Sequence, residues 1–428
     1  MVSLFHPRRQ RRSAFAAFGV AMLLLLGAVA PAFAQSDATP TAPAKAVGTV
    51  YALTNNFTKN EVLAYNRAED GSLSPSGRFD TGGLGSGSYE ASTNMLIVGS
   101  VKGESSPVDL GGGNDLLFAA NAGSDSISVF QASNDGLKLI DVQDSGGERP
   151  TSMTLKNGVL YVLNSGGTLT GAGLCLAGEP SITGFTVHAD GKLDVIPNST
   201  QKLSGGAASG CAEITFNPKG DVLLVSQWVA DKIDTFTVGK DGVASKAIAN
   251  ETSGFGPFSL AFDAKGHLLT SVNDKQIEGK AGVASYDIGS DGTLTPIGDT
   301  VMYGETDPCW MVVSPDGKYA WVTAFGPSPI VKVDDEASRR GVVSSFSIGG
   351  DGVLAPLDPQ AANIGIGASD IALAGNGHFL YAINSFAGTI SGFSVGDNGS
   401  LTLVAAVAGL PINPFAPLSS GLATRENS

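Results

Sequence analysis

Acidic and basic side chains stand close together at two points of the sequence where they could act on a carbonyl compound. Glu148 and Arg149 are adjacent, and Glu305 lies two residues before Asp307. A carboxylate can be the base that activates water, and a guanidinium can stabilise the oxyanion formed when water attacks an ester carbonyl. Asp370, in an apolar segment, is a further candidate. These residues indicate ester hydrolysis if the fold brings them together; otherwise they are rim charges or ion pairs between structural units.

Other common catalytic and cofactor signatures are missing from the sequence. It contains no Ser-His-Asp spacing, phosphate-binding loop, histidine metal cluster or EF-hand loop. The four histidines are His6, His188, His267 and His378, and we expect the last three to be surface or turn residues. The sequence therefore predicts no cofactor and no metal.

The first 34 residues have the layout of a secretory signal peptide. Four arginines precede an apolar stretch at residues 14–30, and Ala-Phe-Ala at residues 32–34 forms a small-residue cleavage site. We expect cleavage after Ala34 and a secreted or periplasmic protein; an uncleaved N-terminal anchor is the alternative. Residues 35–47, rich in Pro, Ala and Thr, are predicted to be a disordered leader.

The charge of the chain excludes two classes of partner. Without the four arginines of the signal, 22 basic residues face 40 acidic ones, a net charge of −18. Nucleic acids and anionic membranes attract clustered Lys and Arg, so neither is an expected partner. No second long apolar segment follows the signal, and we expect a soluble monomer.

One sequence pattern recurs seven times after residue 47. Each repeat has an apolar residue, two variable positions, an aromatic residue and then a turn glycine. The glycines are Gly71, Gly136, Gly191, Gly242, Gly292, Gly352 and Gly399; six follow Asp and the last follows Asn. Asp-Gly and Asn-Gly pairs favour tight hairpins, because these residues tolerate positive φ. The spacing of about 55 residues, with further apolar strands before each aromatic one, is typical of four-stranded propeller blades.

The ends of the repeat region predict how the ring closes. We name the strands of each blade a to d, from the central axis outward. The first blade begins on a b-strand near Val50, and residues 419–423 resemble an a-strand that has no blade of its own. We therefore predict an all-β, seven-bladed β-propeller over residues 48–424, closed by a C-terminal strand that joins the first blade and followed by a tail at 425–428.

Two insertions and three cysteines interrupt the repeats. Residues 100–113 and 325–340 are long connections that could line a recognition rim or be solvated decoration. Cys309 lies in an apolar a-strand and is predicted to be a buried core residue. Cys175 and Cys211 are predicted to form a disulfide in an exported protein.

The repeats resemble a known family. Residues 314–322 (SPDGKYAWV) and 291–296 (DGTLTP) are similar to the lactonase family of seven-bladed propellers, which includes bacterial 6-phosphogluconolactonase and fungal carboxymuconate cyclase. This resemblance spans residues 48–424 and implies lactone hydrolysis or formation in the central cleft without an obligatory metal. Active members carry His and Arg just before the a-strands. The equivalent stretches here contain no histidine.

Two hypotheses follow, and the sequence leaves open whether the protein is an enzyme. The first is an exported lactonase-family propeller that binds, or also hydrolyses, a small lactone or sugar acid in its central cleft. Its candidate catalytic residues are Glu148, Arg149, Glu305 and Asp307. The second is a non-catalytic extracellular or envelope propeller that binds a protein or glycan through its loop-bearing face.

Overall fold

The structure is a computed structural model that describes residues 45–100, 115–167, 175, 178–326, 341–364, 367–412 and 419–427. The chain divides into two compact units, residues 1–43 and 44–428. The predicted signal peptide and most of the predicted leader lie outside the described residues, as do most of the two insertions. No helix in the described ranges is both long and apolar enough to cross a membrane.

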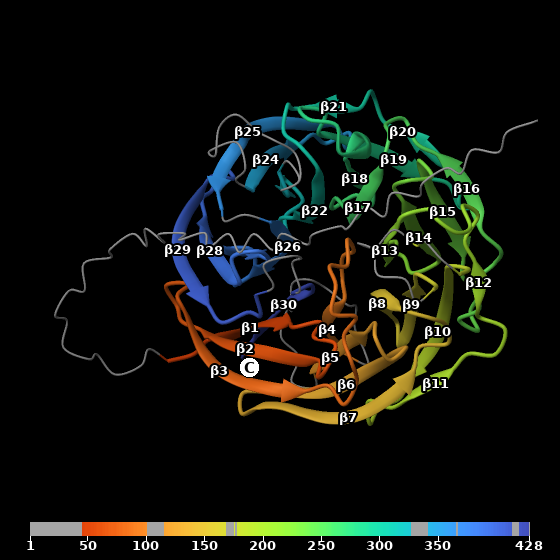
Figure 1. Cartoon of the computed structure of the whole chain (residues 1–428). Coiled ribbons are helices and arrows are strands. Elements are labelled where there is room, and N and C mark those ends of the chain that lie inside the picture. Colours follow the sequence, from red (N-terminus) through yellow and green to blue (C-terminus); the bar gives the residue numbers. More distant parts are fainter. Residues whose placement is uncertain are drawn as a thin grey trace, which may run out of the picture. The chain divides into compact units, whose positions relative to one another are not determined.

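Residues 44–428 form a ring of seven antiparallel sheets, each with four strand positions (Figure 1), so the predicted seven-bladed propeller is confirmed. From the axis outward, the first blade contains β30 (Leu422–Glu426), β1 (Gly48–Leu53), β2 (Glu61–Arg67) and β3 (Leu73–Asp80). The second contains β4 (Leu96–Ser100), β5 (Asp115–Asn121), β6 (Ser126–Ser133) and β7 (Gly136–Asp144). The third contains β8 (Pro150–Lys156), β9 (Val159–Asn164) and β10 (Ser181–Val187), with β11 (Leu193–Val195) and β12 (Gln201–Lys202) sharing the outer position.

The remaining blades repeat this order. The fourth contains β13 (Cys211–Phe216), β14 (Val222–Gln227), β15 (Lys232–Thr237) and β16 (Ile248–Glu251). The fifth contains β17 (Pro257–Phe262), β18 (Leu268–Val272) and β19 (Gly282–Ile288), with β20 (Leu294–Pro296) and β21 (Val301–Met302) outside. The sixth contains β22 (Pro308–Val313), β23 (Tyr319–Ala324), β24 (Val342–Ile348) and β25 (Leu354–Asn363). The seventh contains β26 (Ala368–Ala374), β27 (Phe379–Asn384), β28 (Thr389–Val395) and β29 (Leu401–Ala408).

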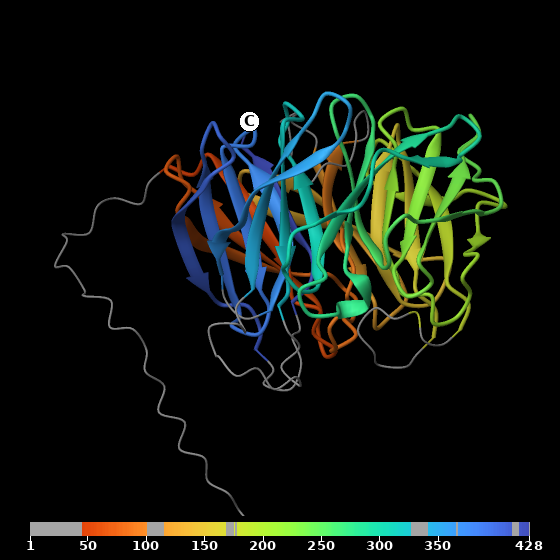
Figure 2. The ribbon, with the colours of Figure 1, turned by 90° about the horizontal axis from the view of Figure 1, so that it is seen from above.

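The antiparallel order gives the ring two distinct faces, seen edge-on in Figure 2. The a–b and c–d turns, such as residues 217–221 and 263–266, lie on what we call the turn face. The b–c and d–a connections lie on the opposite face, which we call the loop face. The short 3₁₀ helix η1 (Asp274–Gln276) belongs to a b–c connection and so marks the loop face, whereas the C-terminal end follows an a-strand and marks the turn face.

The glycines of the c–d turns join neighbouring blades. Gly242 has φ +78°, and a Cβ there would lie 2.9 Å from Ile196 of the preceding blade. Its carbonyl accepts a hydrogen bond from the buried Tyr161 hydroxyl of that blade at 2.7 Å. Tyr381 donates in the same way to Gly71, across the junction of the seventh and first blades. The repeated glycine thus permits the turn conformation and also lets two blades approach closely.

The closing strand confirms the predicted end of the ring. β30 pairs with β1 along its length and runs as far as Glu426, beyond the segment expected from the sequence. Arg425 on this strand donates to Asp115 of the second blade at 2.8 Å, and both side chains are buried. The first blade is therefore built from both ends of the repeat region.

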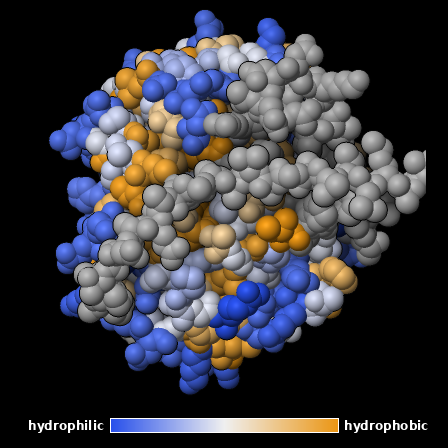
Figure 3. Space-filling model, turned by 60° about the vertical axis from the view of Figure 1, so that its left-hand side comes forward, coloured by the Kyte–Doolittle hydropathy of each residue, from blue (hydrophilic) through white to orange (hydrophobic). Residues whose placement is uncertain are grey.

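The predictions for the cysteines also hold. Cys175 and Cys211 form a disulfide, and Cys309 is a buried free thiol. The side of the molecule shown in Figure 3 is largely hydrophilic, with hydrophobic residues in separate groups.

Candidate active site

The a-strands that line the central channel carry a bulge near their start. In the third to seventh blades, the pairing between the a- and b-strands shifts register after the first residue of the a-strand. The third residues of these five strands are Ser152, Glu213, Ser259, Trp310 and Asp370. A bulge re-aims the side chains that lie in it.

Four of these side chains bind the next blade through one repeated hydrogen bond. Each accepts a bond from a backbone N–H on the adjoining a-strand. The bonds join Ile214 N to Ser152 Oγ (3.1 Å), Leu260 N to Glu213 Oε2 (2.7 Å), Met311 N to Ser259 Oγ (3.0 Å) and Leu422 N to Asp370 Oδ2 (2.8 Å). In two blades a serine makes this bond. The carboxyl groups of Glu213 and Asp370 are therefore not required for the bond between neighbouring blades.

Glu213 is buried, and only 4% of the residue is exposed to solvent. Its Oε1 accepts a hydrogen bond from the Asn94 side-chain amide at 2.9 Å. Burial, with a smaller contribution from the charge of Asp370, raises the pKa of Glu213 to about 8. Near neutral pH Glu213 is therefore mainly protonated and can donate a proton.

Asp370 is 5% exposed and lies on the seventh blade, three blades away from Glu213 around the ring. Burial raises its pKa to about 7, although the backbone N–H groups of Leu422 and Ile371 stabilise its charged form. Near pH 7 about half of this group is therefore a carboxylate. An acid and a base with neighbouring pKa values thus face the same channel.

A cavity of about 410 Å³ occupies the channel beside these two carboxyl groups. Its inner end is lined by Thr93, Asn94, Glu213, Ser259, Trp310 and Asp370. A cavity of this size is adequate for a small organic ligand. The residues present can therefore bind such a molecule and offer it a proton donor and a proton acceptor.

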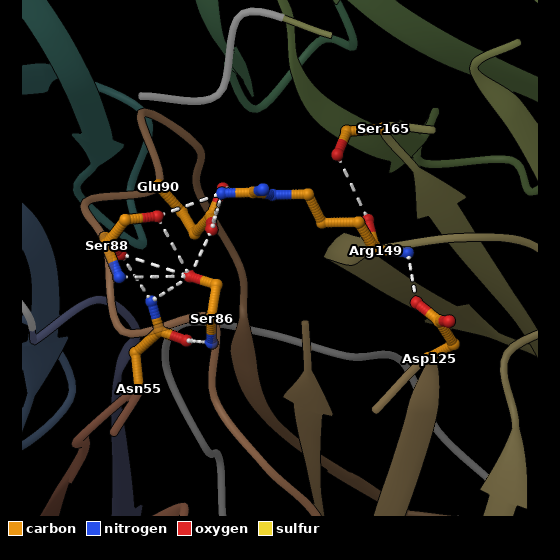
Figure 4. A network of polar contacts seen from close by, with 7 residues as sticks. All are labelled: Asn55, Ser86, Ser88, Glu90, Asp125, Arg149 and Ser165. Atoms are coloured by element: carbon orange, nitrogen blue, oxygen red, sulfur yellow. Dashed lines mark hydrogen bonds and ion pairs between the residues drawn. The ribbon is translucent and has the colours of Figure 1, made fainter. Parts of the chain in front are cut away.

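A different polar network lies at the loop face, and Arg149 is its centre (Figure 4). The Arg149 guanidinium pairs with the fully buried Glu90, with Nη2–Oε1 and Nε–Oε2 distances of 2.6 and 3.2 Å. It also donates to Ser88, while its backbone N–H donates to Asp125. Burial raises the pKa of Glu90, and the Arg149 charge partly offsets this. The guanidinium is thus held in an ion pair between segments of two blades.

Glu90 belongs to a segment that crosses the channel between β3 and β4, residues 86–94 (the crossing segment). Its later residues bind the fourth and sixth blades. Trp310 Nε1 donates to Ser92 O at 2.9 Å, Thr93 N donates to Ala212 O at 3.1 Å, and the Asn94 amide donates to Glu213. Tyr89 packs between Trp310 and Phe325, with ring centroids 6.3 and 5.4 Å apart. The crossing segment therefore forms a wall of the channel.

The predicted site residues occupy the loop-face end of the a-strands. Glu148 is exposed and accepts from the Gly167 N–H at 2.9 Å. Glu305 is half-buried and accepts from Gln360. Asp307 is buried, accepts from Gln276 at 2.9 Å, and has its pKa raised by burial to about 6. None of the four lines the cavity beside Glu213 and Asp370.

Two of these residues share an unusual backbone position. The residue just before the a-strand has positive φ in six blades, and it is glycine in four of them. Arg149 (φ 59°) and Asp307 (φ 54°) are the exceptions. A non-glycine residue with positive φ destabilises the folded protein by on the order of 1 kcal/mol or more. The polar contacts of Arg149 and Asp307 on the loop face must offset this cost.

Sequence reasoning identified Asp370 but missed Glu213 and Glu90. Glu213 had a detectable signal, since it is an acid inside a short apolar strand, as Asp370 is. Glu90 had none, because the crossing segment has no periodic pattern. In the described part of the chain, no group of three or more His, Cys, Asp or Glu side chains is placed to hold a metal ion.

Comparison with known proteins identifies the fold. No protein-family model matches the sequence, and no curated protein is significantly similar to it. A putative 6-phosphogluconolactonase of Bacteroides fragilis has a TM-score of 0.58 at 19% identity, over 90% of this chain and 99% of that one. The periplasmic gluconolactonase of Pseudomonas aeruginosa gives 0.59 at 15% identity, over 89% and 100%. A Lactobacillus plantarum protein gives 0.60 at 15%, over 89% and 99%.

These likenesses confirm that the chain has the fold of the 6-phosphogluconolactonase-like seven-bladed propellers. At such low identities they show the architecture and leave the chemistry to the site itself.

Proposed function

We propose that this protein is an exported lactonase-type propeller that binds a small lactone or sugar acid in its central cavity and hydrolyses the lactone. The observation that carries the proposal is the presence of Glu213 and Asp370 on one cavity, at positions where two other blades use serine. The names of two structural neighbours, a putative 6-phosphogluconolactonase and a gluconolactonase, support the substrate class.

The proposed reaction assigns one role to each carboxyl group. The Asp370 carboxylate accepts a proton from water as the water oxygen attacks the lactone carbonyl carbon. The neutral Glu213 carboxyl donates its proton to the ring oxygen as the ring C–O bond breaks, which releases the open hydroxy acid. A proton then passes from Asp370 to Glu213 through solvent, and the starting state is restored. No cofactor is required.

A panel of purified lactones tests this assignment. We expect Glu213→Gln and Asp370→Asn each to lower kcat by about 100-fold or more, because each removes a proton-transfer group with little change of shape. The pH profile of kcat/KM should be bell-shaped, rising as Asp370 ionises near pH 7 and falling as Glu213 ionises near pH 8. Circular dichroism must show that both variants remain folded.

The four residues predicted from the sequence provide the competing arm of the same experiment. If Arg149 and Glu148 form the catalytic site, Arg149→Met and Glu148→Gln will abolish turnover while Glu213→Gln leaves it unchanged. That result, or the absence of turnover on every lactone, would refute the assignment to Glu213 and Asp370. Glu305→Gln and Asp307→Asn complete this arm.

A second candidate function is binding of a glycan through the loop face. Several large apolar side chains are exposed there, including Phe57 (67%), Phe255 (59%) and Ile412 (63%). Exposed aromatic rings can stack on the apolar faces of sugar rings. Affinity electrophoresis in polysaccharide gels checks this function: Phe57→Ser and Phe255→Ser should remove any retardation, and Leu403→Ser on the outer strand β29 is the exposed control.

A further inference from the structure

The cavity is lined by the part of the a-strands that leads toward the turn face. It begins at their third residues, such as Glu213, and continues to the a–b turns on the turn face. Pro218, Ala264 and Pro315 in these turns line the cavity and are exposed to solvent. In the third to seventh blades, neither of the first two residues of the a-strand is among the described lining residues, and no described residue of a b–c connection is among them.

The crossing segment closes the opposite end. Thr93 and Asn94 line the innermost part of the cavity, and both are fastened to the fourth blade by the bonds to Ala212 and Glu213. On its other side the segment is held by the buried pair of Glu90 and Arg149. Because this wall is bonded to several blades, it separates the cavity from the loop face.

Polar residues surround the open end. The seventh residues of four successive a-strands, or the residues just after those strands, are Lys156, Asn217, Asp263 and Ser314, and all four line the cavity. Asn217 accepts from the Gly220 N–H, Asp263 pairs with His267, and Ser314 accepts from the Lys318 N–H. These side chains therefore hold the a–b turns in place above an apolar sleeve that includes Leu260 and Met311. Because these polar atoms are bonded within their own turns, they fix the shape of the rim around a cavity whose size suits a small ligand.

We infer that the ligand reaches Glu213 and Asp370 from the turn face, past a rim formed by Lys156, Asn217, Asp263 and Ser314. The crossing segment forms the inner wall, and the loop-face end of the channel, which carries Arg149 and Asp307, is not the entrance. The identity of the ligand rests on the proposed function. The direction of access does not.

Thiol labelling tests the direction of access without any substrate. Ala261 is half-buried and lines the cavity, so Ala261→Cys places a thiol inside it. We expect a small methanethiosulfonate reagent to label this thiol in the folded protein, while the native Cys309 stays protected by burial. Adding Ala264→Trp at the exposed rim should slow labelling by about 10-fold, because the reagent must then pass an indole ring.

Val229→Trp is the matched control on the loop face. Val229 is exposed and lies against Gly210, at the start of β13. We expect it to leave the labelling rate unchanged. Slower labelling with Val229→Trp, equal rates with both tryptophans, or no labelling of Ala261→Cys would each overturn the inference.

The same two tryptophan variants separate this inference from the proposed function. If a lactone is hydrolysed, Ala264→Trp should lower kcat/KM by about 10-fold or more and Val229→Trp should not. If no lactone is hydrolysed but labelling depends on Ala264→Trp, the proposed function fails and the direction of access stands. If turnover depends on Glu213 but Ala264→Trp does not change the labelling rate, the proposed function stands and the direction of access fails.

Discussion

Glu213 and Asp370 give the fold a pH dependence opposite to that of most acidic groups. Their pKa values of about 8 and about 7 lie above the ordinary 4.5 and 3.8. Between the ordinary and the raised values the folded chain binds more protons than the unfolded chain. The free energy of unfolding therefore falls as pH rises. Their stabilising contribution is complete below about pH 4 and is lost by about pH 8.

Glu213→Gln should remove its part of this dependence, since an amide does not ionise. Relative to the unmodified protein, we expect the variant to gain on the order of 2–4 kcal/mol between pH 5 and pH 9. Urea denaturation at pH 5, 7 and 9 measures this difference. Parallel stability curves for the two proteins would show that Glu213 has no raised pKa.

Arg149 and Glu90 should behave as a coupled buried pair. Arg149→Met leaves the Glu90 carboxylate buried without its guanidinium and should cost about 3–5 kcal/mol of unfolding free energy. Arg149→Met combined with Glu90→Gln should cost less than the sum of the two single variants. Denaturant unfolding of the four proteins gives the coupling energy.

The exposed pair of Lys202 and Glu179 is the matched control for this double-mutant cycle. Lys202→Met should change stability by less than about 1 kcal/mol, because water and salt already screen that pair. Additive costs at Arg149 and Glu90 would mean that each side chain acts through separate contacts.

At the scale of strands, the closing strand β30 stabilises both the first and the second blade. It covers the edge of β1 and supplies Arg425 to Asp115. A truncation that removes residues 422–428 should therefore prevent cooperative folding, since it exposes a strand edge and leaves a buried carboxylate unpaired.

Thermal unfolding followed by circular dichroism measures the effect of this truncation. Removal of only residues 427 and 428 is the control, and it should shift Tm by no more than a few degrees because the strand itself remains intact. A sharp, unshifted transition in the longer truncation would show that the ring does not need its closing strand.

The strands themselves were predictable, because each leaves a local signal. The Asp-Gly turn that follows the aromatic strand at Tyr65 repeats in six blades, and Asn-Gly replaces it in the seventh, so the count of blades follows from this turn. The residue range of β30 was less certain, since its pairing partner β1 lies at the other end of the repeats. Pairing at such a separation leaves no trace in neighbouring residues.

The site was harder to predict than the strands for a physical reason. Which side chain of an a-strand enters the channel depends on the bulge after its first residue, as at Cys211, and a bulge has no fixed sequence signature. The crossing segment is irregular, so its contact between Glu90 and Arg149 could not be foreseen. Asp370 was noticed because an acid in an apolar strand is conspicuous, but its proximity to Glu213 is a property of the ring.

For the whole molecule, the disulfide and the N-terminal segment together predict that oxidation of the cysteines depends on export. The chain contains three cysteines; two form the Cys175–Cys211 bridge and Cys309 is free. Disulfides form in the periplasm or outside the cell, whereas cysteine thiols in the cytosol remain reduced. If residues 1–34 direct export, the oxidation state of this bridge reports whether export has occurred.

Expression in a Gram-negative host, with and without residues 2–34, tests this prediction. After unfolding in denaturant, the full-length product should titrate one thiol and begin at Gln35 by mass spectrometry, whereas the product without the signal should titrate three. The reduced protein should also lose about 2–4 kcal/mol of stability, because the bridge closes a loop across 36 positions. Cys309→Ser provides the control, since it should lower both thiol counts by one and leave the difference between the two products unchanged. Equal thiol counts in the two preparations, or retention of residues 1–34 on the isolated protein, would contradict export with cleavage after Ala34.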